Sequence, residues 1–214
     1  PSDAFLVKYD PDGNQLWNRT WGGASDDSGF GVAVDGDGNA YLAGDTSSFG
    51  AGPSDAFLVK YDPDGNQLWN RTWGGASDDS GFGVAVDGDG NAYLAGDTSS
   101  FGAGPSDAFL VKYDPDGNQL WNQTWGGADY DSGRGVAADV DGNAYLAGLT
   151  ESFGAGLSDA FLVKNSCQDN INGELPDDDD SDAEEELMIP FGSVYLLFLG
   201  VAVVSVVWHQ KKRT

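Results

Sequence analysis

Residues 1–8 read PSDAFLVK, and the same letters return at residues 53–60 and 105–112. A fourth copy, at residues 157–164, reads LSDAFLVK. The chain therefore repeats with a period of 52 residues. Units 1–52 and 53–104 are identical, unit 105–156 differs from them at eight positions, and the partial unit 157–164 follows. A period near 50 residues is typical of architectures in which each unit buries its faces against its neighbours.

Each unit contains four stretches with β-strand character. In the first unit they are DAFLVKYD (3–10), QLWNRTW (15–21), GFGVAVD (29–35) and AYLAG (40–44). Turn-forming residues separate them, and no 3.6-residue apolar period is present. We predict four antiparallel strands per unit, joined by hairpins. The small residues of the last two stretches are expected where strands converge on a crowded axis.

Both faces of the first strand are apolar, because Phe5, Val7 and Tyr9 alternate with Ala4 and Leu6. In an antiparallel sheet, two covered faces mean that one sheet stacks on another. Residues 1–164 are therefore predicted to be all-β, a β-propeller of 52-residue four-stranded repeats.

The residues of the second unit carry a family resemblance. DAFLVKYDPDGNQLW (55–69), GVAVD (83–87) and DGNAYLAG (89–96) resemble the SBBP family of β-propeller repeats and, more distantly, NHL repeats. The resemblance implies a propeller fold, often in an extracellular setting, and no particular activity. The NHL layout implies blades at about 29–75 and 81–127, a partial blade at 133–164, and two outer strands within 3–21 from an earlier blade.

These repeats supply about three blades, whereas propellers close with about four to eight. Because the sequence opens at Pro1 in the middle of a repeat, we expect it to be the C-terminal fragment of a longer product. The alternative is that several chains complete one ring. As the sequence stands, the first strand should have an unpaired edge that is prone to association.

Composition excludes several classes of function. The 35 acidic residues against 10 basic ones give a net charge of -25, which argues against nucleic acid as a partner. The single cysteine, Cys167, rules out a disulfide framework and cysteine-rich metal sites. The single histidine, His209, lies near the C-terminus, which excludes histidine-based catalysis in the repeats.

After the repeats, residues 165–186 hold ten acidic residues and no basic one, which predicts an extended acidic linker. The uncharged stretch from Leu187 to Trp208 would span about 33 Å as a helix, enough to cross a membrane core of about 30 Å. The tail, 209–214, ends in a basic cluster of Lys211, Lys212 and Arg213. We therefore expect a single pass through the plasma membrane, with the C-terminus cytoplasmic and the repeats extracellular.

The order of acidic spacer, apolar span and basic cluster is similar to C-terminal sorting signals of archaeal and bacterial surface proteins. Residues 189–192 (IPFG) are loosely like the Pro-Gly-Phe motif of archaeal examples, with glycine and phenylalanine exchanged. Whether the helix is retained or removed by a sorting enzyme stays open.

Two turn sequences are weak calcium candidates. One contains Asp10, Asp12 and Asn14, and the other contains Asp35, Asp37 and Asn39. Oxygen ligands at alternate positions are typical of Ca²⁺ loops, but neither sequence ends in the bidentate glutamate of an EF-hand. Because hairpin turns favour the same residues, we predict turns and commit to no metal or cofactor.

A paired carboxylate, Asp26-Asp27, is the feature that most suggests acid–base chemistry. It recurs as Asp78-Asp79 and, altered, at Asp131, which favours a structural role because one ring needs only one active site. The eight positions that differ in the third unit include Arg134 and Glu151 and show no catalytic constellation. No catalytic residue is predicted, and the chain is not expected to be an enzyme.

Each full unit carries one N-glycosylation sequon, at Asn18, Asn70 and Asn122. The assumed blade phase places these residues on the outermost strand, where modifying enzymes reach them. The alternative is an ordinary solvent-facing asparagine.

Three classes of function remain. The first is a membrane-anchored surface propeller that binds or displays, with an extracellular protein or glycan as partner. The second is a structural component of the cell envelope. The third is the non-catalytic C-terminal part of a larger extracellular enzyme.

Overall fold

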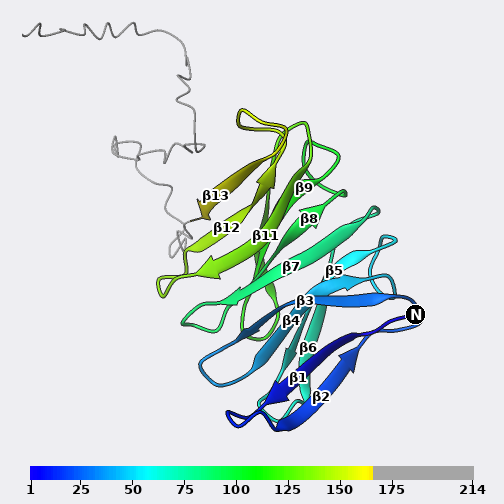
Figure 1. Ribbon diagram of the computed structural model, residues 1–214, viewed down its shortest axis with the longest axis vertical. Helices are drawn as coiled ribbons and strands as arrows, with labels where there is room; N and C mark the ends of the chain where they lie inside the picture. Colours follow the sequence, from blue (N-terminus) through cyan, green and yellow to red (C-terminus); the bar gives the residue numbers. More distant parts are fainter. Residues whose placement is uncertain (166–214) are drawn as a thin grey trace, which may run out of the picture.

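The computed structural model describes residues 1–165, which form thirteen β-strands and no helix (Figure 1). The strands make four antiparallel sheets, in which each strand lies beside the next one along the chain. The first sheet contains β1 (Ala4–Tyr9) and β2 (Gln15–Trp21). The second contains β3 (Asp27–Val34), β4 (Ala40–Thr46), β5 (Asp55–Tyr61) and β6 (Gln67–Trp73). The third contains β7 (Asp79–Val86), β8 (Ala92–Thr98), β9 (Asp107–Tyr113) and β10 (Gln119–Trp125). The fourth contains β11 (Asp131–Ala138), β12 (Ala144–Thr150) and β13 (Asp159–Asn165).

These sheets confirm the predicted four-stranded units and the strands at which each blade was predicted to start and end. The two complete sheets, β3–β6 and β7–β10, start at the glycine-rich strand and end at the tryptophan-rich strand. Figure 1 shows the sheets following one another, from β1 and β2 at one end to β13 at the other. We refer to each sheet as a blade.

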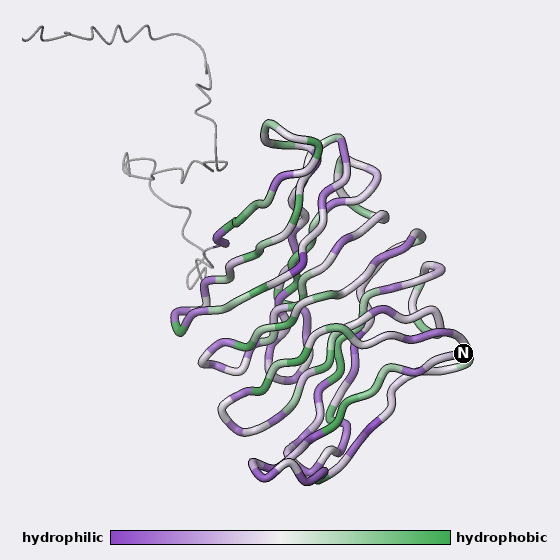
Figure 2. Tube along the Cα trace, viewed as in Figure 1, coloured by the Kyte–Doolittle hydropathy of each residue, from purple (hydrophilic) through white to green (hydrophobic). Residues whose placement is uncertain are grey.

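The core lies between blades and not within them, as expected for stacked sheets. Three apolar clusters of buried residues recur, one at each boundary between successive blades of the described chain. At each boundary a tryptophan at the end of the outer strand lies on a phenylalanine of the next blade. The centroid distances are 4.1 Å for Trp21 on Phe57, 4.2 Å for Trp73 on Phe109 and 4.1 Å for Trp125 on Phe161. Figure 2 shows apolar stretches running along these stacked strands.

The inner strands approach one another so closely that glycine is needed. A Cβ on Gly31 in β3 would lie 2.8 Å from the carbonyl oxygen of Phe82 in β7. The strand register shifts beside this position in β3, β7 and β11, which places Phe30, Phe82 and Arg134 at β-bulges. The prediction that small residues mark converging strands is confirmed.

Several predicted features lie outside the described residues: all of the acidic linker but Asn165, the apolar stretch 187–208, the tail 209–214 and Cys167. Residues 1–165 contain no helix long and apolar enough to cross a membrane.

Candidate functional site

The last two strands of the first blade and of the second blade are each fastened to a hairpin turn of the next blade. Lys8 Nζ and Trp17 Nε1 donate hydrogen bonds to the carbonyl oxygen of Pro63, at 2.9 and 3.0 Å, and Arg19 Nε donates to that of Gly65 at 2.5 Å. The next boundary repeats these contacts with Lys60, Trp69 and Arg71 as donors and the carbonyls of Pro115 and Gly117 as acceptors. We call each set a blade lock. The lysine and arginine of each lock are therefore already hydrogen-bonded to the neighbouring blade.

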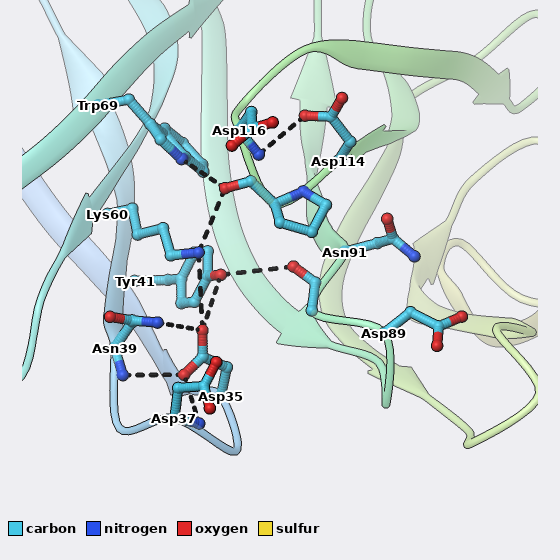
Figure 3. A network of polar contacts seen from close by, with 12 residues as sticks. Asp35, Asp37, Asn39, Tyr41, Lys60, Trp69, Asp89, Asn91, Asp114 and Asp116 are labelled. Atoms are coloured by element: carbon cyan, nitrogen blue, oxygen red, sulfur yellow. Dashed lines mark hydrogen bonds and ion pairs between the residues drawn. The ribbon is translucent and has the colours of Figure 1, made fainter.

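A second contact network joins the blades near the β3–β4 turn (Figure 3). Asp35 Oδ2 accepts hydrogen bonds from Asn39 Nδ2 at 2.8 Å and from the Tyr41 hydroxyl at 3.1 Å, and Lys60 Nζ lies 3.7 Å away. The Tyr41 hydroxyl also lies 3.4 Å from the carbonyl oxygen of Gly90 in the next blade. Partial burial raises the pKa of Asp35, but hydrogen bonds from Asn39 and Tyr41 and the charge of Lys60 lower it overall.

The other weak calcium candidate is organised in the same way. Asp10 Oδ1 accepts the backbone amides of Asp12 and Asn14, at 3.0 and 2.8 Å, and its Oδ2 accepts Asn14 Nδ2 at 2.9 Å. These are the contacts of a tight turn, with Gly13 at a φ of 83°. Within residues 1–165 no group of three or more His, Cys, Asp or Glu side chains is placed to hold a metal ion.

The turn carboxylates make the fold sensitive to acid. In four turns a hydrogen bond from the turn asparagine is the main cause that lowers the carboxylate pKa below its ordinary value of 3.8, at Asp10, Asp62, Asp114 and Asp139. In Asp35 and Asp87 burial raises the pKa, but hydrogen bonds and a nearby lysine lower it overall. Groups with a lowered pKa stabilise the folded state above about pH 4, and that contribution is lost as the pH falls through their folded pKa. Asp45 and Asp55, whose pKa burial raises, act in the opposite direction but are fewer.

We therefore expect the urea midpoint of unfolding to fall steadily as the pH is lowered from 5 to 2.5. Far-UV circular dichroism of the chain in urea at each pH measures it. The variant Asn91→Ala, which removes one side-chain donor to Asp87, should be less stable than the parent chain at pH 5 and should lose less further stability on acidification, because the folded pKa of Asp87 moves toward its unfolded value. A midpoint that stays level or rises on acidification would contradict the assignment.

The paired carboxylates divide into one buried and one exposed member. Asp27 is 1% exposed, and it accepts hydrogen bonds from the hydroxyls of Thr46 and Ser48 and from the amide of Gly23. Asp26 is exposed and accepts the amide of Ser2 at 2.8 Å. Asp79 repeats the buried arrangement. Asp131 repeats only the bonds from the glycine amide and the serine hydroxyl, and its buried Oδ1 has no hydrogen-bond partner among the described residues. The pair therefore closes a loop between strands and does not present two carboxylates to a substrate.

A group of side chains at the boundary between the third and fourth blades departs from this repetition. Asp97 Oδ2, on β8, accepts hydrogen bonds from the hydroxyls of Tyr130 and Ser132 of the next blade, both at 2.9 Å. Arg134 lies with its guanidinium carbon 4.3 Å from the centroid of the Phe82 ring, and one of its nitrogens is 3.5 Å from the Tyr130 hydroxyl. We call these residues the inner-strand cluster: Phe82, Asp97, Tyr130, Ser132 and Arg134.

Most of the differences between the third unit and the other two gather at this cluster. Tyr130 stands where the other units have Asp26 and Asp78, and Arg134 stands where they have Phe30 and Phe82. Leu149 pairs with Ser132, the amide of Glu151 donates to the carbonyl of Tyr130 at 2.8 Å, and Asp129 precedes Tyr130. Five of the eight differing positions thus lie together at the start of β11 and the end of β12. Sequence reasoning missed this grouping.

The cluster places a protonated phenol beside an exposed cation. Burial, followed by the hydrogen bond to Asp97 and its charge, raises the pKa of Tyr130, so its hydroxyl stays protonated and donates. Arg134 is exposed, and it makes no ion pair with an acidic side chain of the described residues. Its guanidinium is fixed in orientation by the Phe82 ring. It therefore presents an oriented positive charge on an otherwise acidic chain.

The three sequons lie where the blade phase placed them, on the outer strands β2, β6 and β10. Asn18, Asn70 and Asn122 are exposed, and so is the threonine two residues after each. The intervening Arg19 and Arg71 point instead into the blade locks. The modifiable amides therefore face solvent.

Comparison with known families agrees with this fold. The SBBP β-propeller repeat matches residues 20–50 and 72–102. A β-propeller domain of unknown function, DUF5122, matches residues 36–67 and 88–119. The described residues therefore contain SBBP- and DUF5122-type β-propeller repeats.

One curated relative is the regulatory protein FlaEY of Caulobacter vibrioides, which is 29% identical over 195 residues. The alignment takes in 79% of this chain, but the chain spans only about a fifth of that relative's length (20%). Among solved structures, a protein of unknown function from Bacteroides caccae aligns with a TM-score of 0.42 at 14% identity, covering 75% of this chain and 49% of its own.

Proposed function

We propose that this chain of SBBP-type β-propeller repeats is a non-catalytic binding module, and that its partner contacts the inner-strand cluster. The observation that carries the proposal is the grouping of five of the eight differing positions around one contact network. Substitutions without a functional effect would be scattered over the blade. Grouped changes that bring a cation, a phenol and an aromatic ring together favour a surface kept for contact with another molecule.

The chemistry of the cluster favours an acidic glycan. Arginine binds a carboxylate through paired N–H donors, and the orientation set by Phe82 lowers the entropy lost on binding. Tyr130 and the exposed ring of Phe30, which lies 5.5 Å from Phe82, offer surfaces on which the apolar face of a sugar packs. The net charge of the chain is screened beyond about 8 Å in physiological salt, so the local cation decides the contact.

Reverting the cluster to the sequence of the other repeats tests the proposal. The double variant Tyr130→Asp/Arg134→Phe introduces only residues that the same fold already holds at positions 78 and 82. On an array of sialylated, uronic-acid-containing and neutral glycans, we expect the parent chain to bind acidic glycans. The variant should bind them at least about tenfold more weakly, a loss of about 1.4 kcal/mol.

The matched control is Gln123→Arg, which also restores a repeat residue but lies on the outer strand β10. It should bind like the parent chain. Equal binding by the double variant would show that the cluster is not the contact surface. Failure of the parent chain to bind any glycan on the array would contradict a glycan partner.

We also propose that the module is displayed at the cell surface. In this arrangement the stretch 187–208 crosses the plasma membrane, residues 165–186 hold the repeats away from it, and the basic tail stays cytoplasmic. The exposure of Asn18, Asn70 and Asn122 supports an extracellular setting, in which these sequons carry glycans. The repetition of identical blade locks would equally suit a structural envelope component, which would show no binding in the glycan experiment.

A further inference from the structure

The outer strands β2, β6 and β10 each have one edge that is unpaired among the described strands. In the two complete blades the strand order runs from β3 to β6 and from β7 to β10, and β2 lies in the corresponding place beside β1. A strand at the edge of a sheet presents backbone N–H and C=O groups with which another strand can pair. These edges follow from the order of strands within a blade, so they are the same whatever residues precede or follow the repeats.

The sequence of these edges favours pairing. β2 and β6 both read QLWNRTW, and β10 reads QLWNQTW. A seven-residue strand that is rich in aromatic residues, carries little charge and contains neither proline nor glycine has the composition of segments that associate as sheets. Each edge also presents a leucine, and Leu16, Leu68 and Leu120 are 55%, 52% and 52% exposed.

The charge that would discourage such pairing is turned away from the edge. Charged side chains, proline and bulges protect the edge strands of many proteins. The one charged residue of β6, Arg71, donates from Nε to the carbonyl oxygen of Gly117 at 2.6 Å and from Nη2 to that of Asp116 at 3.2 Å. Its guanidinium is thus held on the turn of the next blade, and its counterpart in β10 is the uncharged Gln123. The pairing of β5 with β6 is irregular at one end only, which leaves residues 69–73 in regular register.

An N-glycosylation sequon lies in the middle of each of these strands. Asn70 and Thr72 are exposed and share one face of β6 with Leu68, because alternate residues of a strand point to the same side. The third unit keeps its sequon although the residue inside it, Gln123, differs from the arginine of the other units. A bulky polar group on the asparagine would therefore cover both the exposed leucine and the free edge.

A groove beside Asn70 has room for the first sugars of such a group. Its volume is about 860 Å³, and its walls include Leu68 and Trp69 of β6 and Pro115 and Asp116 of the next blade. The apolar walls suit the apolar face of a sugar ring, and the exposed carboxylate of Asp116 can accept hydrogen bonds from sugar hydroxyls. A glycan attached at Asn70 can therefore lie against the strand that carries it.

We propose that N-glycans at Asn18, Asn70 and Asn122 guard the outer strands against pairing with the outer strands of other copies of the chain. A glycan is bulky and hydrated, so a second strand cannot approach to the spacing of about 4.8 Å that a sheet requires. Because the repeats give these blades nearly the same edge, an unguarded outer strand fits every other one. The inference rests on the extracellular setting proposed for the repeats and gives the modification a role there.

Removing the sequons tests the proposal. The full chain is produced in cells that attach N-glycans to exported proteins, purified in detergent micelles and examined by light scattering. Peptide mass spectrometry should find glycans at Asn70 and Asn122. The triple variant Thr20→Ala/Thr72→Ala/Thr124→Ala keeps each asparagine but has no sequon. At equal concentration the protein mass of its particles should be at least about twofold that of the parent chain.

Two controls separate the glycan from other effects of substitution. The parent chain and the triple variant, made in cells that attach no glycans, should associate equally, and a difference between them would assign the effect to the threonines and overturn the proposal. The variant Asn18→Lys/Asn70→Lys/Asn122→Lys places a charge on each edge in place of a glycan and should keep the particle mass of the glycosylated parent chain. The edge of β1 is the same in all of these chains, so it does not contribute to the differences.

Two further outcomes would overturn the proposal. One is that all three asparagines remain unmodified in the glycosylating cells, and the other is that the triple variant has the particle mass of the glycosylated parent chain. Both are distinct from a failure of the proposed binding function, because every variant leaves the inner-strand cluster unchanged. Each should therefore bind acidic glycans on the array as the parent chain does.

Discussion

The variant Gly96→Ala should lower the free energy of unfolding by about 3 kcal/mol or more. A Cβ at this position in β8 would lie 1.8 Å from the carbonyl oxygen of Ser80 and 2.7 Å from the Phe109 ring. The first contact is with the backbone of the paired strand β7, so no side-chain rotation relieves it. The bulge that follows Gly81 and the stacking of Trp73 on Phe109 both depend on this close approach. The third blade should therefore lose its inner pairing.

Urea unfolding followed by tryptophan fluorescence measures this loss. The control is Gly36→Ala, because a Cβ on Gly36 meets no atom within 4 Å and its φ is not in the left-handed region. That variant should unfold at a urea concentration close to that of the parent chain. If both variants unfolded at the same urea concentration, the close approach of β7 and β8 would not be a determinant of stability.

The variant Asp79→Ala should cost about 3 kcal/mol, because it leaves three buried or half-buried donors without their acceptor. These donors are the hydroxyls of Thr98 and Ser100 and the amide of Gly75. Asp79 is 0% exposed, so water does not readily replace the carboxylate. The turn between β6 and β7 and the end of β8 should both loosen.

The adjacent carboxylate provides the control for this prediction. Asp78 is exposed, and its carbonyl oxygen, which accepts the amide of Ser99 at 2.9 Å, remains in Asp78→Ala. We expect that variant to lie within about 0.5 kcal/mol of the parent chain. Hydrogen exchange of the Gly75 amide gives an independent reading, since it should quicken in Asp79→Ala alone. Equal effects of the two variants would contradict the division of the pair into a structural member and a solvent member.

The fold was predictable because the same pattern of strands and turns recurs in each 52-residue repeat. The stretch that reads QLWNRTW was predicted as a strand over residues 15–21, and β2 has those bounds. The inner strand was predicted over 29–35 and begins two residues earlier, because Asp27 already pairs with Thr46. Pairing of that kind is a tertiary contact, and no local sequence signal announces it.

The candidate site was less predictable, for two physical reasons. Tyr130 and Glu151 are 21 positions apart, and only the antiparallel pairing of β11 with β12 makes them neighbours. Asp97, which accepts the hydrogen bond from the Tyr130 hydroxyl, comes from the preceding blade and is unchanged in the first repeat, as Asp45. The turn carboxylates show the opposite difficulty. Asp10 and Asp35 have the composition of a Ca²⁺ loop, and only the observed donors to both oxygens of each show that turn contacts already occupy them.

The blade locks also bear on how such a chain grows. In both locks the tryptophan donor and the proline carbonyl are 46 residues apart, which is less than one repeat. Duplicating residues 53–104 would therefore recreate a complete lock at the new boundary without altering an existing one. Each such genetic duplication adds one whole blade. The curvature needed to close the ring then decides which blade numbers are retained.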